Sequence, residues 1–191
     1  MTPEASTVPV IRAVTTADLQ SDEVRAIRSL MDVAFVDDDL GGFGDDDWDH
    51  ALGGVHFLVA DEATGEVLAH ASVVARELRV ADRPLRTGYV EAVATRPDRQ
   101  REGLGSAVMR AVNVHLDETY ELGALGTGSH GFYERLGWKT WRGPSSVRVA
   151  GGERTTPDED GSILVYRTTR TPPDLDLDAP ISCDWRPGDV W

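Results

Sequence analysis

The sequence predicts an α+β fold, with a mixed and mostly antiparallel central sheet and helices on both of its faces. Three β-prone runs follow one another between residues 55 and 95, and helices with one apolar face are predicted before and after them. The chain has 191 residues, of which 40% are hydrophobic and 27% are charged, as in a globular domain with a sizeable core. No repeat or linker interrupts it, so we expect a single domain over residues 1–191.

The first half of the chain predicts one strand and one helix, followed by an antiparallel meander. Residues 8–14 form a short β-prone run, and residues 15–18 offer helix-capping side chains. Apolar residues then recur at helical spacing from Leu19 to Phe35, which indicates an amphipathic helix. Residues 55–61 and 67–80 are predicted to form a hairpin around a turn that contains Gly65, and residues 85–95 the next strand.

Residues 88–109 combine a strand, a polar turn and the start of a helix. The strand leads into an arginine-rich loop, and the helix is predicted to begin at Gly103-Leu104-Gly105. The N-terminus of a helix presents backbone N–H groups and the positive end of the helix dipole, which together bind anions. We therefore expect a phosphate-binding site at this turn.

The last third predicts short elements and a tail that packs on the domain. Strands are expected at residues 121–125, 138–141 and 162–168, and a short helix at residues 130–136 that ends at Gly137. The C-terminal tail, residues 171–191, contains Trp185 and Trp191, and tryptophan is usually well buried. We therefore expect the tail to fold back on the domain.

The protein is strongly acidic, and its acidic residues are clustered. Against 33 Asp and Glu there are 19 Lys and Arg, a net charge of −14 that disfavours binding to nucleic acid or to an anionic membrane. Seven aspartates, with Phe43 and Trp48, lie in a segment that we predict to be an acidic loop, residues 36–50. Three interpretations are open: a solvated loop, a calcium loop without the usual ligand spacing, and a lid that binds a polycation.

The sequence also predicts the cellular compartment. Cys183 is the only cysteine, so that an intrachain disulfide is excluded and a reducing compartment is permitted. No apolar run reaches the ~20 residues of a membrane span, and residues 1–9 lack the pattern of a signal peptide. We expect a cytoplasmic protein.

Glu91 is the first candidate for chemistry because it lies on a strand that otherwise favours burial. Its neighbours are Tyr89, Val90, Ala92 and Val93. A carboxylate inside a protein costs free energy unless it is paired or has a function, and partial desolvation raises its pKa. Such a group can take a proton from an amine, directly or through a water molecule. The alternative is a structural ion pair with an arginine.

Two motifs resemble those of the GNAT superfamily of N-acetyltransferases. Residues 100–105, QREGLG, fit its pyrophosphate-binding signature Q/R-x-x-G-x-G/A, and residues 133–138, YERLGW, resemble its Y-x-x-x-G-[F/W] segment. The resemblance implies an acetyl-CoA-dependent enzyme with a three-layer fold, in which the strand before the turn splays from its neighbour. Tyr133 is then the proton donor to the departing thiolate, and the backbone of Val93 and Thr95 binds pantetheine. The implied pyrophosphate contacts are Gln100, Arg101, Glu102, Gly103, Leu104 and Gly105.

A longer resemblance, from about Val10 to Trp191, is to the aminoglycoside 2′-N-acetyltransferases. It rests on ALGG at 51–54, GYVE at 88–91, LGAL at 122–125, GPSSV at 143–147 and CDWRPGDVW at 183–191. The resemblance implies a homodimer that acetylates the 2′-amino group of aminoglycoside antibiotics in a ternary complex, with Glu91 as base through water and Tyr133 as acid. The implied drug contacts are one of Asp38 and Asp39, Asp47, Glu91, Ala92, Gly126, Glu159, Asp189 and the carboxylate of Trp191.

The chain departs from this pattern at two of the implied contacts, and other functions stay open. Gly126 stands where the family has a serine, which removes a hydroxyl contact, and Glu159 stands where it has an aspartate, which moves the carboxylate by one methylene. The alternatives are an N-acetyltransferase for another polyamine or a peptide amine, a non-catalytic module that binds acyl-CoA or a cationic drug, and an acidic metal-binding protein.

Overall fold

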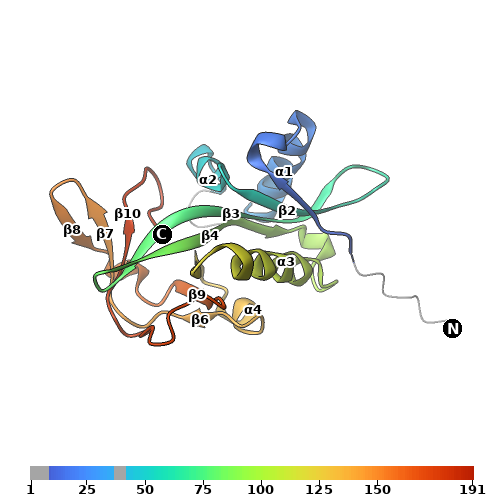
Figure 1. The fold of residues 1–191 in the computed structure, drawn as a ribbon. Helices are drawn as coiled ribbons and strands as arrows, with labels where there is room; N and C mark the ends of the chain where they lie inside the picture. Colours follow the sequence, from blue (N-terminus) through green and yellow to red (C-terminus); the bar gives the residue numbers. More distant parts are fainter. Residues whose placement is uncertain (1–8, 37–41) are drawn as a thin grey trace.

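The computed structural model describes residues 9–36 and 42–191, which form a long mixed sheet with helices on both faces (Figure 1). This arrangement confirms the predicted α+β class. None of the described helices is long and apolar enough to span a bilayer. Short 3-10 turns lie at Thr16–Asp18, Pro97–Arg99 and Pro157–Glu159. The helices and strands, in chain order, are β1 (Arg12–Thr15), α1 (Ser21–Ala34), α2 (Asp45–Ala51), β2 (Val55–Ala60), β3 (Val67–Val80), β4 (Arg83–Thr95), α3 (Leu104–Thr119), β5 (Leu122–Gly126), α4 (His130–Glu134), β6 (Lys139–Thr140), β7 (Ser145–Val149), β8 (Gly152–Thr155), β9 (Ile163–Arg167) and β10 (Ile181–Asp184).

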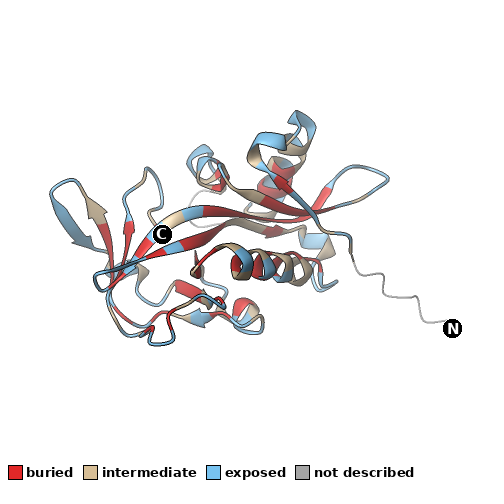
Figure 2. Cartoon of the chain, viewed as in Figure 1, coloured by how far each residue is buried: buried red, intermediate tan, exposed pale blue. Residues whose placement is uncertain are grey.

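Helices cover opposite faces of the central strands. Phe57 of β2 packs in a core with residues of α3, whereas its neighbour Leu58 packs in a core with residues of α1 and α2. Because adjacent residues of a strand point to opposite faces, α3 lies on one side of the sheet and α1 and α2 lie on the other. Figure 2 shows the same division, with buried residues along β3, β4 and the sheet-facing side of α3.

β4 is a central strand, and its pairing changes along its length. On one side it pairs antiparallel with β3 over almost its whole length. On the other side it pairs parallel with β5 only between Thr87, opposite Leu122, and Tyr89, opposite Ala124. Beyond Tyr89 the two strands part, as the resemblance implied. The backbone of β4 beyond this point has no strand partner on that side among the described residues.

The acidic segment is partly helical, which corrects the loop predicted at residues 36–50. The Gly44 N–H donates to Oδ2 of Asp47 at 2.7 Å, and three aspartates occupy the first turn of α2. Negative charge is stabilising there because it faces the positive end of the helix dipole. Trp48 and Ala51 are buried in the core that α2 shares with α1. The prediction was wrong because a run of aspartates favours a loop by composition, whereas tertiary burial of two residues decides the structure.

The tail packs on the domain through a strand that the sequence did not predict. β10 pairs antiparallel with the end of β3 and parallel with β7, and β7 and β8 form a hairpin that was also not predicted. Leu175, Ile181, Cys183 and Trp191 are buried in the core that these strands share with β4 and β5. Each of the three strands has only four or five residues, too few for a periodic pattern, so their pairing depends on distant partners.

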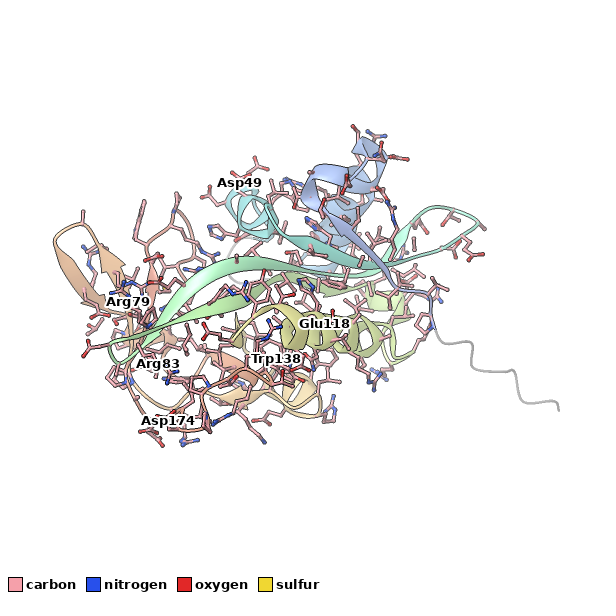
Figure 3. All side chains as sticks on the ribbon, in the orientation of Figure 1. Asp49, Arg79, Arg83, Glu118, Trp138 and Asp174 are labelled. Atoms are coloured by element: carbon pink, nitrogen blue, oxygen red, sulfur yellow. The ribbon has the colours of Figure 1, made fainter. Side chains whose placement is uncertain are left out.

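Figure 3 shows all described side chains on the ribbon and labels Trp138, Arg83 and Asp174. Trp138 is fully buried, and its indole Nε1 donates to Oδ1 of Asn113 on α3 at 3.1 Å. Arg83, at the start of β4, pairs with Asp174 near the beginning of the tail at 3.6 Å. The tail therefore contacts the sheet near its start as well as at β10.

Candidate active site

A β-bulge interrupts β4 beyond the point where β4 and β5 part. The β3–β4 register shifts by one residue between His70 and Ser72, so that β4 carries one extra residue, and Ala92 has a φ of +50°. Positive φ is uncommon outside glycine and persists where the surrounding structure enforces it. A bulge re-aims the side chains next to it, and here Glu91 and Val93 flank Ala92.

The parted strands border a cleft of about 410 Å³, which we call the β4–β5 cleft. Phe35 and Phe43 form an aromatic wall, with ring centroids 5.8 Å apart. A larger groove, of about 720 Å³ beside α1, contains none of the predicted site residues. Asp38 and Asp39 lie outside the described residues. The predicted site residues that line the β4–β5 cleft are Asp47, Glu91, Ala92, Val93, Gly126, Tyr133 and Asp189.

The Glu91 carboxylate is largely buried and pairs with Arg186 of the tail. Its Oε1 lies 2.6 Å from Nη1 of Arg186, and the two side chains are 15% and 14% exposed. Burial raises the pKa of Glu91, and the charges of Arg186, Arg76 and His50 oppose this rise without cancelling it. The carboxylate therefore has the raised pKa that suits a base, and it also has the arginine partner of the alternative interpretation.

Arg186 is a site residue that the sequence analysis missed. Its Nε donates to the backbone oxygen of Asp189 at 2.7 Å, and its guanidinium lies 5.5 Å from the ring centroid of Tyr89. Arg76 lies over the same ring at 4.6 Å. The available signal was that Arg186 is the only basic residue of a tail rich in aspartate. A lone cation among acids is a candidate for a buried ion pair.

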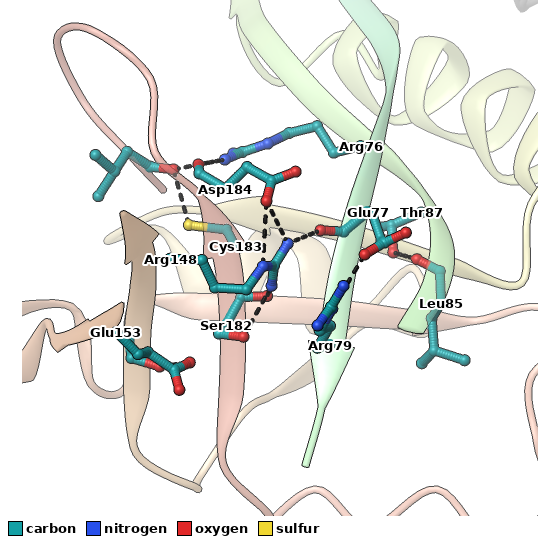
Figure 4. A network of polar contacts seen from close by, with 12 residues as sticks. Arg76, Glu77, Arg79, Leu85, Thr87, Arg148, Glu153, Ser182, Cys183 and Asp184 are labelled. Carbon is teal, nitrogen blue, oxygen red and sulfur yellow. Dashed lines mark hydrogen bonds and ion pairs between the residues drawn. The ribbon is translucent and has the colours of Figure 1, made fainter. Parts of the chain in front are cut away.

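Two arginines fix the tail to the sheet (Figure 4). Arg76 of β3 donates through Nη2 to the backbone oxygens of Asp184 and Val190, at 3.0 and 2.9 Å. Arg148 of β7 donates through Nη1 to the backbone oxygen of Ser182 at 2.7 Å and pairs through Nη2 with Asp184 at 2.8 Å. The loop between β10 and the last residues is therefore held at both ends.

Tyr133 lines the cleft from α4 as a protonated phenol. Its ring packs edge-on against Phe132 and Trp138, with centroids 4.9 and 6.1 Å away. Burial raises the pKa of Tyr133 to about 12, so the hydroxyl keeps its proton throughout the physiological range. A fixed, protonated phenol is chemically suited to donate a hydrogen bond or a proton to a departing thiolate.

The turn before α3 has the backbone geometry of an anion site. Arg101 and Gly103 have φ angles of +66° and +85°, and no described side chain caps the N-terminus of α3. Left-handed residues next to a helix N-terminus aim successive N–H groups at an anion. A Cβ on Gly105 would lie 2.7 Å from Oγ1 of Thr95, so a larger residue would crowd the Thr95 side chain where α3 begins beside β4. Leu104 is buried and can offer only its backbone N–H.

The remaining predicted cofactor contacts fit a CoA chain that runs along β4 to this turn. Val93 and Thr95 lie beyond the end of the β4–β5 pairing, where backbone groups face the opening. Gln100 is exposed at the turn. Glu102 pairs with Arg99 at 2.8 Å, which partly neutralises a carboxylate that would repel a phosphate. The open strand, the uncapped helix and the Gly105 contact all fit acetyl-CoA.

Three further predicted contacts lie close together at the tail. The Trp191 N–H donates to Oδ1 of Asp189 at 3.1 Å, and the Trp191 indole donates to Thr156 at 3.0 Å. Burial raises the pKa of Glu159, and the charges of Asp189 and Asp158 raise it further. A crowded set of carboxylates therefore adjoins the cleft, although Glu159 itself does not line it.

Gly126 leaves open space beside a buried hydroxyl. A Cβ at Gly126 would lie 3.7 Å from the hydroxyl of Tyr89 and 3.5 Å from the carbonyl carbon of Trp191. The Tyr89 hydroxyl is buried and has no hydrogen-bond partner within the described part of the chain. A serine at this position has room for its hydroxyl near that of Tyr89. The glycine therefore removes a polar partner from this wall.

A splayed and bulged strand, an anion-binding turn at the start of the next helix, and a buried phenol in the cleft define an acyl-CoA-dependent acyltransferase. Residues 15–141 match the family described as acetyltransferase (GNAT) domain. The chain is also 43% identical over 184 residues to the aminoglycoside 2′-N-acetyltransferase of Mycolicibacterium fortuitum, an alignment that covers 94% of this chain and 91% of that protein.

Solved structures share the fold at low sequence identity. A GNAT family N-acetyltransferase (YhbS) from Escherichia coli, in complex with CoA, aligns with a TM-score of 0.63 and 15% identity over 92% of this chain and 89% of that one. A GCN5-related N-acetyltransferase from Kribbella flavida aligns with a TM-score of 0.54 and 18% identity over 73% of this chain. The chain spans about a third (35%) of the length of that second protein.

The chain belongs to the aminoglycoside 2′-N-acetyltransferase family of the GNAT superfamily, which confirms the resemblance seen in its motifs. It is therefore an acetyltransferase, and its acetyl donor is acetyl-CoA. The acceptor and the roles of individual residues are matters of proposal.

Proposed function

We propose that this enzyme transfers the acetyl group of acetyl-CoA to the 2′-amino group of an aminoglycoside in a ternary complex, and so confers resistance. The observation that carries the proposal is the cleft lined by Asp47, Glu91 and Asp189 together with the phenol of Tyr133. The name of the 43% identical relative supports the acceptor. An aminoglycoside carries several ammonium groups, and a cleft lined by carboxylates gains affinity and association rate for such a ligand.

The acceptor binds along the acidic wall of the cleft. Asp47 comes from α2 and Asp189 from the tail, so two ammonium groups can be held at separate points. Glu159 adds negative charge next to Asp189. A net charge of −14 attracts the polycation from a distance. The other proposed contacts are one of Asp38 and Asp39, Ala92, Gly126 and the carboxylate of Trp191.

Glu91 is the proposed base, and it receives a proton from the acceptor ammonium through a water molecule. Arg186, at 2.6 Å, favours the ionised form of the carboxylate before the acceptor binds. An ammonium that enters the cleft offers a second positive charge to the same carboxylate, so it competes with Arg186. Loss of the proton leaves a neutral amine held next to its target, which is the nucleophilic form.

Acetyl-CoA, when bound, supplies the acetyl group as a thioester. The backbone of Val93 and Thr95 holds the pantetheine arm, and residues 100–105 hold the pyrophosphate at the N-terminus of α3. Tyr133 donates its hydroxyl proton toward the sulfur as negative charge develops there. The pKa of about 12 keeps this proton in place until that moment.

The proposal includes the homodimer that the resemblance implies and the cytoplasmic location expected from the sequence. We infer a homodimer in the cytoplasm, with one acetyltransferase domain over residues 1–191 in each subunit. Size-exclusion chromatography with light scattering measures the mass, which is expected to be that of two chains. A measured mass of one chain would contradict the homodimer but would not affect the proposed reaction.

The acceptor is tested with acetyl-CoA and pairs of aminoglycosides that differ only in an amino or a hydroxyl group at the 2′ position. We expect release of free thiol, and one added acetyl group by mass spectrometry, with the 2′-amino compounds alone. Equal turnover of both members of each pair would contradict 2′ specificity. Spermidine and a lysine peptide in the same assay test the alternative acceptors.

A further inference from the structure

Two fully buried histidines link the N-terminal part of the sheet to the bulge in β4. His56 of β2 and His70 of β3 are both 0% exposed, and Nδ1 of His56 lies 3.0 Å from Nε2 of His70. Nδ1 of His70 lies 2.8 Å from the backbone oxygen of Ala92, and Nε2 of His56 lies 2.9 Å from Oγ1 of Thr16. The Gly53 N–H donates to the same Thr16 oxygen at 2.9 Å. These groups form one chain of hydrogen bonds that ends at the bulge.

The carbonyl at the end of this chain fixes the direction of every bond in it. A carbonyl oxygen only accepts, so the proton shared with Ala92 belongs to Nδ1 of His70. A neutral imidazole carries one N–H, so Nε2 of His70 is an acceptor and Nδ1 of His56 donates to it. Nε2 of His56 then carries no proton and accepts from the Thr16 hydroxyl at 2.9 Å; the backbone oxygen of Gly54 is a second, more distant acceptor for this hydroxyl, at 3.3 Å. The chain therefore requires the Nδ1–H tautomer in both rings.

Both rings are neutral at physiological pH, as this assignment requires. Burial disfavours the charged form and lowers the pKa of His56 to about 4 and that of His70 to about 3. Trp48 of α2 packs against His56, with ring centroids 6.0 Å apart, and helps to exclude water from the pair.

The bond to Ala92 replaces a strand contact that the bulge removes. Ala92 and Val93 have no partner in the β3–β4 register. A buried carbonyl without a partner is unfavourable, so the donation from His70 favours the bulged strand over a regular one. Without the extra residue, the side chains on one side of the bulge would turn to the opposite face of the sheet. Glu91 is the residue just before it.

We propose that His70, kept in the Nδ1–H tautomer by His56, is a positioning residue for acetyl transfer. It acts through Ala92: the hydrogen bond holds the bulge, and the bulge aims Glu91 into the cleft. The role of Glu91 as base rests on the proposed function. The tautomers and the bulge do not, because they belong to the protein without substrate.

The tautomers are measured first, by ¹⁵N–¹H NMR of the imidazole rings of the full chain at neutral pH. The signals of His56 and His70 are assigned by their disappearance in variants of each residue. We expect Nδ1 protonated and Nε2 unprotonated in both rings, although a free imidazole in water favours Nε2–H. Either ring in the Nε2–H form, or with both nitrogens protonated, would overturn the proposal.

His70→Asn and His70→Phe then distinguish the effect of the hydrogen bond to Ala92 from the effect of the space that the ring fills. The Asn amide can donate from the position of Nδ1, whereas Phe fills the space and donates nothing. We expect His70→Phe to lower kcat by about a hundred-fold, as a misplacement of about 1 Å does, with little change in KM for acetyl-CoA. His70→Asn is expected to recover most of this loss. An equal loss in both variants, or wild-type kcat in His70→Phe, would contradict the positioning role.

His115→Phe is the matched control for loss of an imidazole. His115 of α3 packs against Phe57, with ring centroids 5.5 Å apart, and its Nε2 has no partner among the described residues. His115 packs on the α3 face of the sheet, whereas His56 and His70 lie on the opposite face, so wild-type kcat is expected. A loss as large as that of His70→Phe would indicate a general packing effect and overturn the proposal.

The test also covers two other outcomes: a His70→Phe variant that does not fold, and a wild-type enzyme that does not acetylate aminoglycosides. If His70→Phe does not fold, His70→Leu replaces it, because a leucine also donates no hydrogen bond to Ala92; wild-type kcat in this variant would overturn the proposal. If the wild-type enzyme acetylates no aminoglycoside, the proposed acceptor is wrong. The NMR result, obtained without substrate, still decides the assignment of the histidines.

Discussion

The donor side and the acceptor side of the β4–β5 cleft are built in different ways. The donor side comes from one continuous segment, in which β4 leads through residues 100–105 into α3. The acceptor side is assembled from α2 and the tail, which lie far apart in sequence, and the 3-10 turn at Pro157–Glu159 adjoins it. In the proposed function, the donor side presents backbone N–H groups to an anion, and the acceptor side presents carboxylates to a cation. Local geometry thus determines one side, and tertiary packing determines the other.

Glu91 lies where the two sides meet. It belongs to the continuous donor segment, but its partner Arg186 comes from the tail. The tail is in turn fixed by Arg76 of β3 and Arg148 of β7, neither of which belongs to the donor segment. The protonation of Glu91 therefore depends on a segment that the donor side does not need, and the following predictions use this dependence.

Glu91→Gln is expected to have the largest effect, because it removes the residue that both sides share. An amide cannot take a proton from the acceptor, so kcat should fall by about a thousand-fold, while KM for acetyl-CoA stays unchanged. Steady-state kinetics with acetyl-CoA and a 2′-amino aminoglycoside measures both. Glu77→Gln on β3 is the control, because the Glu77 side chain is exposed and pairs with Arg79 at 3.1 Å, outside the residues that line the cleft. Wild-type kcat in Glu91→Gln would remove Glu91 from the mechanism.

Gly105→Ala is expected to damage the donor side alone. The new Cβ would lie 2.7 Å from Oγ1 of Thr95, so either the Thr95 side chain or the start of α3 must shift, at the strand and turn proposed to hold acetyl-CoA. KM for acetyl-CoA should rise by about ten-fold, equivalent to about 1.4 kcal/mol of binding, with little change in KM for the acceptor. Gly128→Ala is the control, since a Cβ there has open space around it. An equal rise in both KM values would show that the two sides are not separable.

The same difference explains how much of the site could be predicted from sequence. The strand, turn and helix of residues 88–109 were predicted because each signal is local: alternation, then glycines, then helical spacing. Arg186 was missed because only the folded tail brings it to Glu91. His70 was missed because one histidine on a buried strand has no periodic signal, and its role depends on the bulge opposite it.

The fold shows the same limit. The class, the meander and α3 could be predicted because their patterns are long. α2 could not, because its aspartates favour a loop by composition and only the burial of Trp48 shows which face packs. β10 could not, because four residues become a strand only between β3 and β7. The roles assigned to Glu91 and Tyr133 stay predictions until the variants are measured.

Arg186→Gln is expected to have the smallest effect on the chemical step, and the part of the effect that concerns Glu91 lies in the pH dependence. Burial raises the pKa of Glu91, and Arg186 is the largest opposing charge, followed by Arg76 and His50, while the ring of Tyr89 lies beside both arginines. Without Arg186 the pKa of Glu91 rises further, so more of the enzyme carries a protonated carboxyl that cannot accept the substrate proton. The acidic limb of kcat/KM should move to higher pH, with a loss of roughly ten-fold near pH 6 that fades at higher pH.

Arg186→Lys is the matched control. Lysine keeps the positive charge but lacks the Nε–H that donates to the backbone oxygen of Asp189. Both variants weaken the anchoring of the tail, so a loss shared by the two at every pH measures that anchoring. Only a shift of the acidic limb in Arg186→Gln, absent in Arg186→Lys, reports on the ionisation of Glu91. If the acidic limb does not move, Arg186 stabilises the packing of the tail and does not affect the ionisation of Glu91. The predicted dependence of Glu91 on the tail would then be wrong.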